Sequence, residues 1–365
     1  MLLKKTLTLV SLGVVCAAFS AKAQDSADTA AAKPLLSGYA DVYYRYNFGN
    51  PKRDAATGDR LTNNFTSFTN KHNSFELNMI SLKMEHSIGK VSMVADVGFG
   101  NRAEEFSYAD NNTKFAIKQL FVSYSPAENL KLTLGSWATH IGYELVDPTG
   151  NRNYSMSYLF SYGPFLHTGF KAEYTAGIVG LMAGIANPTD LKSTNFDYKT
   201  AIAQISVAPS DNFKAYLSFQ GGQMDDSTKN SQLDAVITGV ITDKFNIGVN
   251  GTYSWNKYKE AAGAFGPTQT WAGAALYLNV DPTDVLGLTL RGEYFSDKDA
   301  LKVFTAYPGG GSVFESTLSA NIRISNLTII PELRLDQASQ SIFVKNSGAA
   351  TKSTVSALLG AVYRF

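Results

Sequence analysis

The segment 139–165 contains the densest group of side chains that could contact a solute. Asn153 is suited to cap a short helix over residues 154–162, which Gly163 and Pro164 would end. Tyrosines four residues apart would share one stripe of that helix, beside the charged groups of the same segment. The candidate solute-contacting residues are Arg152, Tyr154, Tyr158, Tyr162, Glu144 and Asp147. The simpler alternative is that the tyrosines only pack the segment against a wall.

Covalent catalysis has little support in the sequence. The histidines are His72, His86, His140 and His167, and none lies in an H-E-x-x-H motif. No G-x-S-x-G motif or phosphate-binding loop occurs either, so we expect no catalytic residue. One enzymatic alternative stays open, a Ser–His pair acting on phospholipid, because His140 and His167 flank the segment 139–165.

Neither a metal site nor a cofactor is expected. The only cysteine, Cys16, lies in the N-terminal apolar segment, so the rest of the chain has no thiolate ligand. Asp225-Asp226 and Asp297-x-Asp299 could attract calcium or cations that bridge lipopolysaccharide. Their spacing misses the EF-hand pattern, and solvated loop charge is the better interpretation. The net charge of +1 provides no basic field for nucleic acid.

Charged residues recur on one side of alternating segments. In 312–324, Glu315 and Arg323 alternate with Phe314 and Leu318. An arginine facing lipid near mid-membrane costs about 2–4 kcal/mol, so we expect the charged side to face an aqueous lumen. The expected lumen-lining charges are Asp41, Arg45, Lys171, Glu173, Arg291, Glu293, Glu315, Arg323, Glu332, Arg334 and Asp336. Their mixed signs predict only weak ion selectivity, and cross-strand pairing within the wall is an equally good interpretation.

The elements that position these residues are strands with a period of two. We predict about sixteen, an even number. They span 35–48, 73–87, 90–100, 114–124, 130–138, 166–177, 178–186, 197–208, 212–222, 232–242, 245–256, 270–281, 286–296, 312–324, 326–337 and 353–365.

The connections between these strands alternate in length, short then long. The long ones are 49–72, 101–113, 139–165, 187–196, 223–231, 257–269, 297–311 and 338–352. Antiparallel neighbours joined in this way place all tight turns at one rim and all long loops at the other. A β-sandwich has no reason to keep that phase. We therefore predict an all-β fold, a transmembrane antiparallel up-and-down β-barrel with short periplasmic turns and long extracellular loops.

The composition agrees with this fold class. The 365 residues include 19 Tyr and 22 Phe, and only 17% of the chain is charged. After residue 23, no stretch is apolar enough, over the roughly 18 residues required, for a transmembrane helix.

The N-terminal segment indicates the compartment. Lys4 and Lys5 precede an apolar run that ends in Ala21-Lys22-Ala23, which is typical of a cleavable secretory signal peptide. We therefore expect a signal peptide over 1–23, a flexible polar lead-in over 24–34 and a single barrel over 35–365. A single anchoring helix is the less favoured interpretation of the first segment.

Two features resemble outer-membrane barrels. The last strand, STVSALLGAVYRF, has one apolar face and ends in Phe365. It resembles the C-terminal strands of Gram-negative outer-membrane barrels, whose final Phe serves as an insertion signal. This resemblance implies a contact with the barrel-assembly machinery. The segment 139–165 resembles the third long loop of general porins, which folds inward and forms the constriction.

Longer runs resemble one family. FELNMISLKMEHSIGKVSMVADVGFG (75–100), AIKQLFVSYSPAENLKLTLGSWATHIGYE (116–144), NRNYSMSYLFSYGPFLHTGFK (151–171) and PELRLDQ (331–337) are similar to the OmpL-like β-barrel porin family. The resemblance covers most of the chain after the signal segment. It implies an outer-membrane porin without an assigned solute or catalytic residue.

We therefore expect passive diffusion of small hydrophilic solutes and ions through a water-filled lumen narrowed by the third long loop. A structural or adhesive barrel with a blocked lumen and a barrel-wall hydrolase are the alternatives. The expected surroundings are outer-membrane lipid and lipopolysaccharide, and a homotrimer is a candidate assembly by analogy alone.

Overall fold

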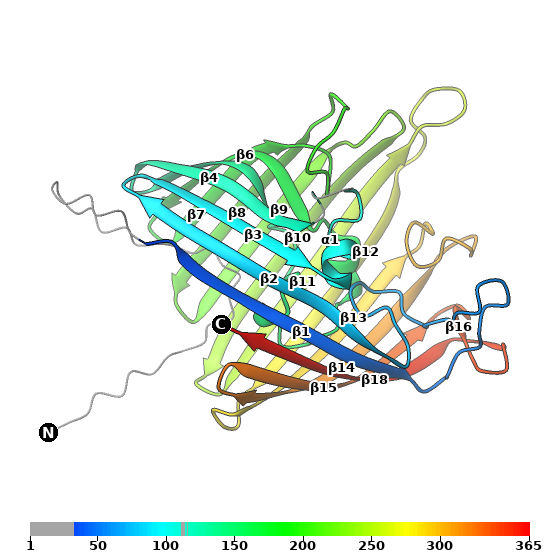
Figure 1. Ribbon diagram of the computed structural model, residues 1–365. Helices are drawn as coiled ribbons and strands as arrows, with labels where there is room; N and C mark the ends of the chain where they lie inside the picture. Colours follow the sequence, from blue (N-terminus) through cyan, green and yellow to red (C-terminus); the bar gives the residue numbers. More distant parts are fainter. Residues whose placement is uncertain (1–32, 111–113, 115) are drawn as a thin grey trace, which may run out of the picture.

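The computed structural model describes residues 33–110, 114 and 116–365, and within them sixteen strands form one closed antiparallel barrel (Figure 1). Neighbours in the barrel are neighbours in the chain, except that β18 pairs with both β15 and β1. The predicted fold class is confirmed. The barrel strands are β1 Leu35–Asn47, β2 Ser74–Ile88, β3 Val91–Phe99, β4 Ile117–Ala127, β5 Leu130–Ala138, β6 Leu166–Ala176, β7 Val179–Ala186, β8 Thr200–Ser210, β9 Phe213–Gln223, β10 Thr228–Thr242, β11 Phe245–Tyr258, β12 Gln269–Val280, β13 Leu286–Asp297, β14 Gly311–Ile324, β15 Leu327–Ala338 and β18 Ser353–Arg364.

Side chains alternate between the two faces of the wall. On β14, Phe314 and Leu318 are exposed on the outer face, whereas Glu315 and Thr317 are buried inside. Exposed apolar and aromatic side chains recur on the outer face of the other strands. This is the pattern of a wall with an apolar exterior and a polar interior.

The barrel closes where the last strand meets the first, and Figure 1 shows the red β18 beside the blue β1. Their register runs from Tyr39 opposite Arg364 to Asn47 opposite Ser356. Phe365 extends the pairing, because its N–H donates to the Gly38 carbonyl (3.0 Å). Its ring covers Gly38, where a Cβ atom would lie 2.6 Å from the ring. Gly38 is therefore what allows the terminal aromatic ring to close the seam.

Strand boundaries differ from the prediction by up to four residues, and three of these differences have a clear physical meaning. Strands β4 and β8 extend past Pro126 and Pro209, which were expected to lie in turns. Both prolines lie where the strand register shifts, at positions that need no ladder N–H. Strand β10 begins at Thr228, four residues earlier than predicted, and only 224–227 separate it from β9. The polar Asn230 and Gln232 belong to this strand rather than to a loop.

Short turns and long loops alternate as predicted except between β9 and β10, where the loop expected over 223–231 is reduced to 224–227. Several of the other long loops fold into the mouth of the barrel. Helix α1 (Asn101–Phe106) lies there beside β2 and β3 (Figure 1). The last long loop forms a small hairpin from β16 (Phe343–Val344) and β17 (Ala350–Thr351). Among the described residues, no helix has both the length and the apolar character needed to cross a membrane. The predicted signal segment, 1–23, lies outside the described residues.

Candidate functional site

The third long loop, residues 139–165 (loop 3), connects β5 to β6 and folds into the barrel. It contains a short 3-10 helix, η2 (Pro148–Gly150), and helix α2 (Tyr158–Tyr162). The predicted helix start at residue 154 was wrong, because Ser157 is the cap and accepts from the Phe160 N–H (3.1 Å). Asn153, the expected cap, instead donates to Ser319 Oγ on β14 (2.7 Å). Contacts with the wall thus decide where this helix begins.

Of the three tyrosines of loop 3, Tyr158 and Tyr162 share one side of the helix, with ring centroids 6.5 Å apart, whereas Tyr154 lies outside the predicted stripe. Tyr154 precedes the helix, and Tyr158 and Tyr162 are its first and last residues. Burial, followed by the nearby carboxylates, raises the pKa values of Tyr154 and Tyr158, so both hydroxyls stay protonated and donate. Their acceptors are Asp41 Oδ2 for Tyr154 (2.6 Å), Asp336 Oδ1 for Tyr158 (2.9 Å) and the Phe65 carbonyl for Tyr162 (2.8 Å).

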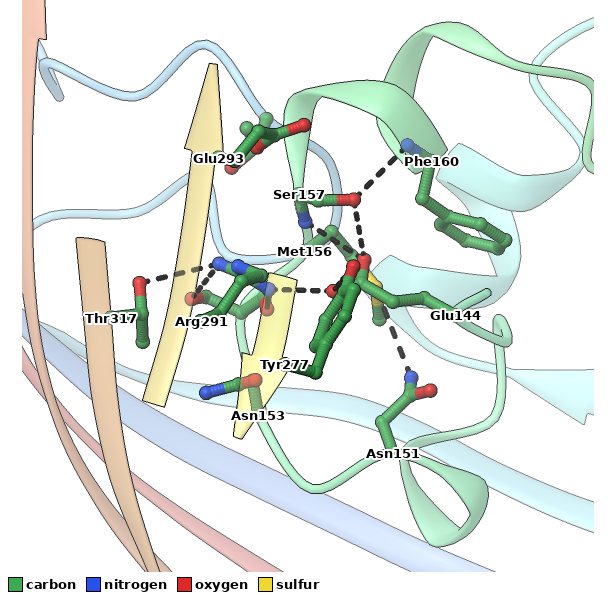
Figure 2. Close-up of polar contacts among 12 residues, drawn as sticks. Glu144, Asn151, Asn153, Met156, Ser157, Phe160, Tyr277, Arg291, Glu293 and Thr317 are labelled. Carbon is green, nitrogen blue, oxygen red and sulfur yellow. Dashed lines mark hydrogen bonds and ion pairs between the residues drawn. The ribbon is translucent and has the colours of Figure 1, made fainter. Parts of the chain in front are cut away.

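Arg291 on β13 connects the wall to loop 3 (Figure 2). Its Nη1 donates to Glu144 Oε1 (2.6 Å) and to the Ser155 carbonyl (2.7 Å), while Nε donates to Glu315 Oε2 (2.9 Å). Glu144 accepts in turn from the backbone N–H and the hydroxyl of Ser157. All charged members of this network are buried, so their charges are compensated by one another and by these hydrogen bonds rather than by water.

Charged wall residues also hold the loop backbone. Glu293 accepts from the Tyr158 and Leu159 N–H groups (2.7 Å each), and Arg334 donates to the Met156 carbonyl (2.7 Å). The bond from the Arg334 guanidinium is charge-assisted and therefore stronger than a neutral one. Loop 3 is therefore fixed along its main chain as well as through its side chains.

Asp147 fastens loop 3 to the opposite side of the barrel. Its Oδ1 lies 2.7 Å from Lys118 Nζ on β4 and accepts from the Tyr39 hydroxyl (2.9 Å) on β1. Burial opposes ionisation, yet Lys118 and these hydrogen bonds hold the pKa of Asp147 below its usual value. The carboxylate is thus charged and paired at neutral pH.

Arg152 reaches the turn end of the barrel. It forms two bonds with Asp281 (2.9 and 2.6 Å), which lies in the turn between β12 and β13. Arg323, one residue before the end of β14, donates to the same Asp281 Oδ1 (2.7 Å). Loop 3 therefore descends from the rim of long loops to the rim of short turns.

The contacts of loop 3 extend around most of the wall. The strands whose inner faces meet it are β1, β2, β4, β8, β9, β10, β11, β12, β13, β14, β15 and β18. Among the eleven wall charges expected to line the lumen, those at most 5% exposed are Asp41, Arg45, Arg291, Glu293, Glu315, Glu332, Arg334 and Asp336. Lys171, Glu173 and Arg323 keep partial exposure. Most of these charges thus contact protein groups, and the half-exposed ones belong to the turn half.

Apolar side chains fill the mouth on both sides of loop 3. One cluster packs Tyr158 and Leu159 against Trp271, Phe295 and Phe304. A second joins Met156, Phe160 and Phe165 of the loop to residues of β1, β2, the first long loop and α1. Local periodicity along the chain gave no signal for this packing.

The histidines do not form a Ser–His pair in the described contacts. The His140 and His167 rings lie 4.9 Å apart and bond to the Phe219 carbonyl and to Thr139 Oγ1. Burial lowers the pKa of His140 to about 4, so the imidazole is neutral at physiological pH. No cluster of three or more potential metal ligands occurs among the described residues.

Sequence reasoning missed Asp190, in the loop between β7 and β8. Its Oδ1 accepts from the Phe165 and Leu166 N–H groups (2.7 and 2.9 Å), and its Oδ2 accepts from the Tyr108 hydroxyl (3.0 Å). Asp190 thereby holds the C-terminal end of loop 3. A lone aspartate in a polar loop carries no local signal of such a role.

Comparisons with known proteins place the chain in a structural context. The sequence model of the family described as "Putative beta-barrel porin-2, OmpL-like" matches residues 35–365. Similar solved structures include outer-membrane OmpT of Vibrio cholerae (TM-score 0.60, 12% identity, 93% of this chain and 100% of that chain). Another is the outer-membrane channel DcaP of Acinetobacter baumannii (TM-score 0.59, 11% identity, 93% of this chain and 99% of that chain). A third is a trimer form of in-vitro folded OmpT (TM-score 0.59, 12% identity, 91% of this chain and 99% of that chain). A search of curated proteins found no match.

Proposed function

The chain belongs to the OmpL-like β-barrel porin-2 family, and on this premise we propose that it is an outer-membrane porin whose passage is set by loop 3. Small hydrophilic solutes and ions would diffuse passively through the space that loop 3 leaves between itself and the wall. The candidate constriction residues are Arg152, Tyr154, Tyr158, Tyr162, Glu144 and Asp147.

The observation that carries the proposal is the attachment of loop 3 across the barrel. Glu144 is joined to Arg291 on β13, and Asp147 is joined to Lys118 on β4. A segment fixed to opposite walls inside a polar barrel limits what passes, because its position cannot fluctuate freely. The same fixed geometry supports size exclusion rather than a mobile gate.

Conductance tests the proposal directly. Replacing 145–151 with a Gly-Ser linker of equal length removes the Asp147 anchor and should raise single-channel conductance in planar bilayers. A matched Gly-Ser replacement of 260–266, in the loop between β11 and β12, should leave conductance unchanged. Equal conductance of the loop 3 variant and the unaltered protein would remove loop 3 from the passage.

A blocked barrel with a structural role is the second candidate, favoured by the breadth of the wall contacts of loop 3. It predicts no current from the unaltered protein and measurable current after the 145–151 replacement. Uptake of graded neutral sugars into vesicles separates the two candidates further, since only an open passage gives a size cut-off.

We propose the outer membrane as the location, with lipid and lipopolysaccharide around the apolar exterior. A signal peptide over 1–23, removed during export, and contact of the Phe365 strand with the barrel-assembly machinery complete this proposal. The trimer form of the similar OmpT supports a homotrimer as the assembly to test. Native mass spectrometry of protein extracted in mild detergent measures it.

A further inference from the structure

The half-exposed charges of the inner wall gather near the rim of short turns. Two opposite-charge pairs there neutralise themselves along single strands, Lys83 with Glu85 (2.9 Å) and Lys171 with Glu173 (3.1 Å). Paired charges largely cancel at a distance, so the electrostatic field in this zone is set by the other charged residues of the inner wall.

Two further lysines in this zone, Lys131 and Lys214, form no ion pair within 4.0 Å among the described residues, although Lys131 lies opposite Glu173 in the register of β5 and β6. Lys131 is the second residue of β5 and shares the inner face with the buried Thr133. Lys214 is the second residue of β9 and shares the inner face with Tyr216 and Ser218. Both residues are half-buried on the inner face of the wall.

Besides the two lysines, one further unbalanced positive charge arises because two guanidinium groups share a single carboxylate. Arg152 and Arg323 both donate to Asp281 Oδ1 (2.6 and 2.7 Å). Gly287 makes room for them, since a Cβ atom there would lie 2.6–2.7 Å from all three side chains. The side chain of Arg323 is 32% exposed, so part of its fork of N–H donors is open to solvent.

The carboxylates near this zone that could balance its positive charges lie farther out. Glu128, Asp211, Asp243 and Asp284 are exposed in the short turns themselves, beyond the ends of the strands. Salt screens such exposed charges over about 8–10 Å, whereas half-buried wall charges are screened much less. The passage therefore meets more positive than negative charge as it reaches the turn rim.

We propose that this zone, centred on Arg152 and Arg323, is an anion-selecting site that favours small solutes bearing carboxylate or phosphate groups. The proposal rests on the channel function proposed above and differs from the expectation of weak ion selectivity. Selection arises because contacts with loop 3 occupy the acidic groups deeper in the barrel. Nearer the turns, Arg152 and Arg323 share the single carboxylate of Asp281, and Lys131 and Lys214 form no ion pair. The planar donors of Arg323 suit oxyanions.

The test is the zero-current potential of the full-length protein in planar bilayers under a tenfold KCl gradient. We expect a chloride-to-potassium permeability ratio above one, and about a twofold fall of this ratio in Arg323→Gln and in Lys214→Gln, because each substitution removes one positive charge from the zone. Arg323→Lys should keep the ratio. Lys345→Gln, the same charge change in the exposed loop after β15, should also leave it unaltered.

A second measurement keeps the two proposals separate. Inorganic phosphate, compared with chloride at equal ionic strength, should raise the thermal unfolding midpoint of the unaltered protein in detergent but not that of Arg323→Gln. If current flows with a chloride-to-potassium permeability ratio at or below one, the anion site is overturned, whereas the proposed channel function is supported. If no current flows, the channel proposal fails, and absence of the phosphate effect then overturns the anion site as well.

Discussion

Arg291 is the side chain on which the contacts of loop 3 converge. It forms ion pairs with Glu144 of the loop and with Glu315 of the neighbouring strand, and all three groups are buried. Such a network stabilises little relative to an apolar replacement of the whole set, but removal of one member leaves uncompensated charge. Loss of any one of these three residues should therefore release the loop from its position on the wall.

Arg291→Met should therefore lower the free energy of unfolding by about 3–5 kcal/mol and release loop 3. Urea unfolding in lipid vesicles measures the first effect, and single-channel conductance the second. Arg323→Met, which removes a half-exposed arginine from the same wall, should cost under about 1 kcal/mol. Adding Glu144→Gln and Glu315→Gln to Arg291→Met should restore part of the loss, and no restoration would contradict the ionic origin of the effect.

Asp190 should make stability depend on pH. Burial raises the pKa of its carboxyl group to about 6, above the ordinary value of 3.8, so the folded state favours the proton. The stability contribution is present in full below pH 3.8 and is lost as the pH rises through 6. Asp190→Asn keeps an acceptor for Phe165 and Leu166 and cannot ionise.

The free energy of unfolding of Asp190→Asn relative to the unaltered protein should thus rise by about 1–3 kcal/mol between pH 4 and pH 7. Urea titrations of both proteins at the two pH values measure this difference, and titration of other carboxyl groups cancels in it. A difference independent of pH would show that folding does not raise the pKa of Asp190.

At the scale of elements, loop 3 depends on close approach to β18. The Tyr154 ring lies over Gly360, where a Cβ atom would be 2.5 Å from the ring. Tyr154 also bonds to Asp41 through its hydroxyl and to Glu332 through its N–H. The inner face of β18 is thus shaped to receive one loop residue.

Gly360→Val should displace Tyr154 and lower the free energy of unfolding by about 1–3 kcal/mol through overpacking. Gly292→Val is the matched control, because an added Cβ there meets nothing within 4 Å. Equal thermal unfolding midpoints for the two variants would contradict the contact between Tyr154 and β18.

The sequence allowed the strands, their two faces and the alternation of connections to be predicted, because these depend on neighbours two residues apart. It did not show that Arg291 would meet Glu144, 147 residues away, or that the start of α2 depends on Ser157. Those contacts depend on which loop enters the barrel and how far. The charges of Glu293 and Arg334 were placed on the inner face, but burial by loop 3 has no periodic signature.

At the scale of the whole molecule, the terminal strand closes the barrel. Phe365 pairs with Gly38 across the seam and presents its ring to the outer surface. Closure removes the last pair of unsatisfied strand edges, which no open sheet within lipid could tolerate.

Phe365→Ala should reduce the amount of folded protein in the outer membrane, measured as the fraction that migrates as the compact form on unheated gels. Phe314→Ala removes an equally exposed outer aromatic side chain away from the seam and should have a much smaller effect. Similar losses in both variants would assign the effect to lost apolar area rather than to the position of Phe365.

The partners of loop 3 are supplied late in the chain. Tyr158 bonds to Glu293, 135 residues downstream, and to Asp336, 178 residues downstream. Strands β13 to β15 are thus synthesised long after the loop, so its contacts with them can form only late. Because contacts so distant in the sequence form slowly, we expect the entry of loop 3 and the pairing of β18 with β1 to limit the rate of folding together.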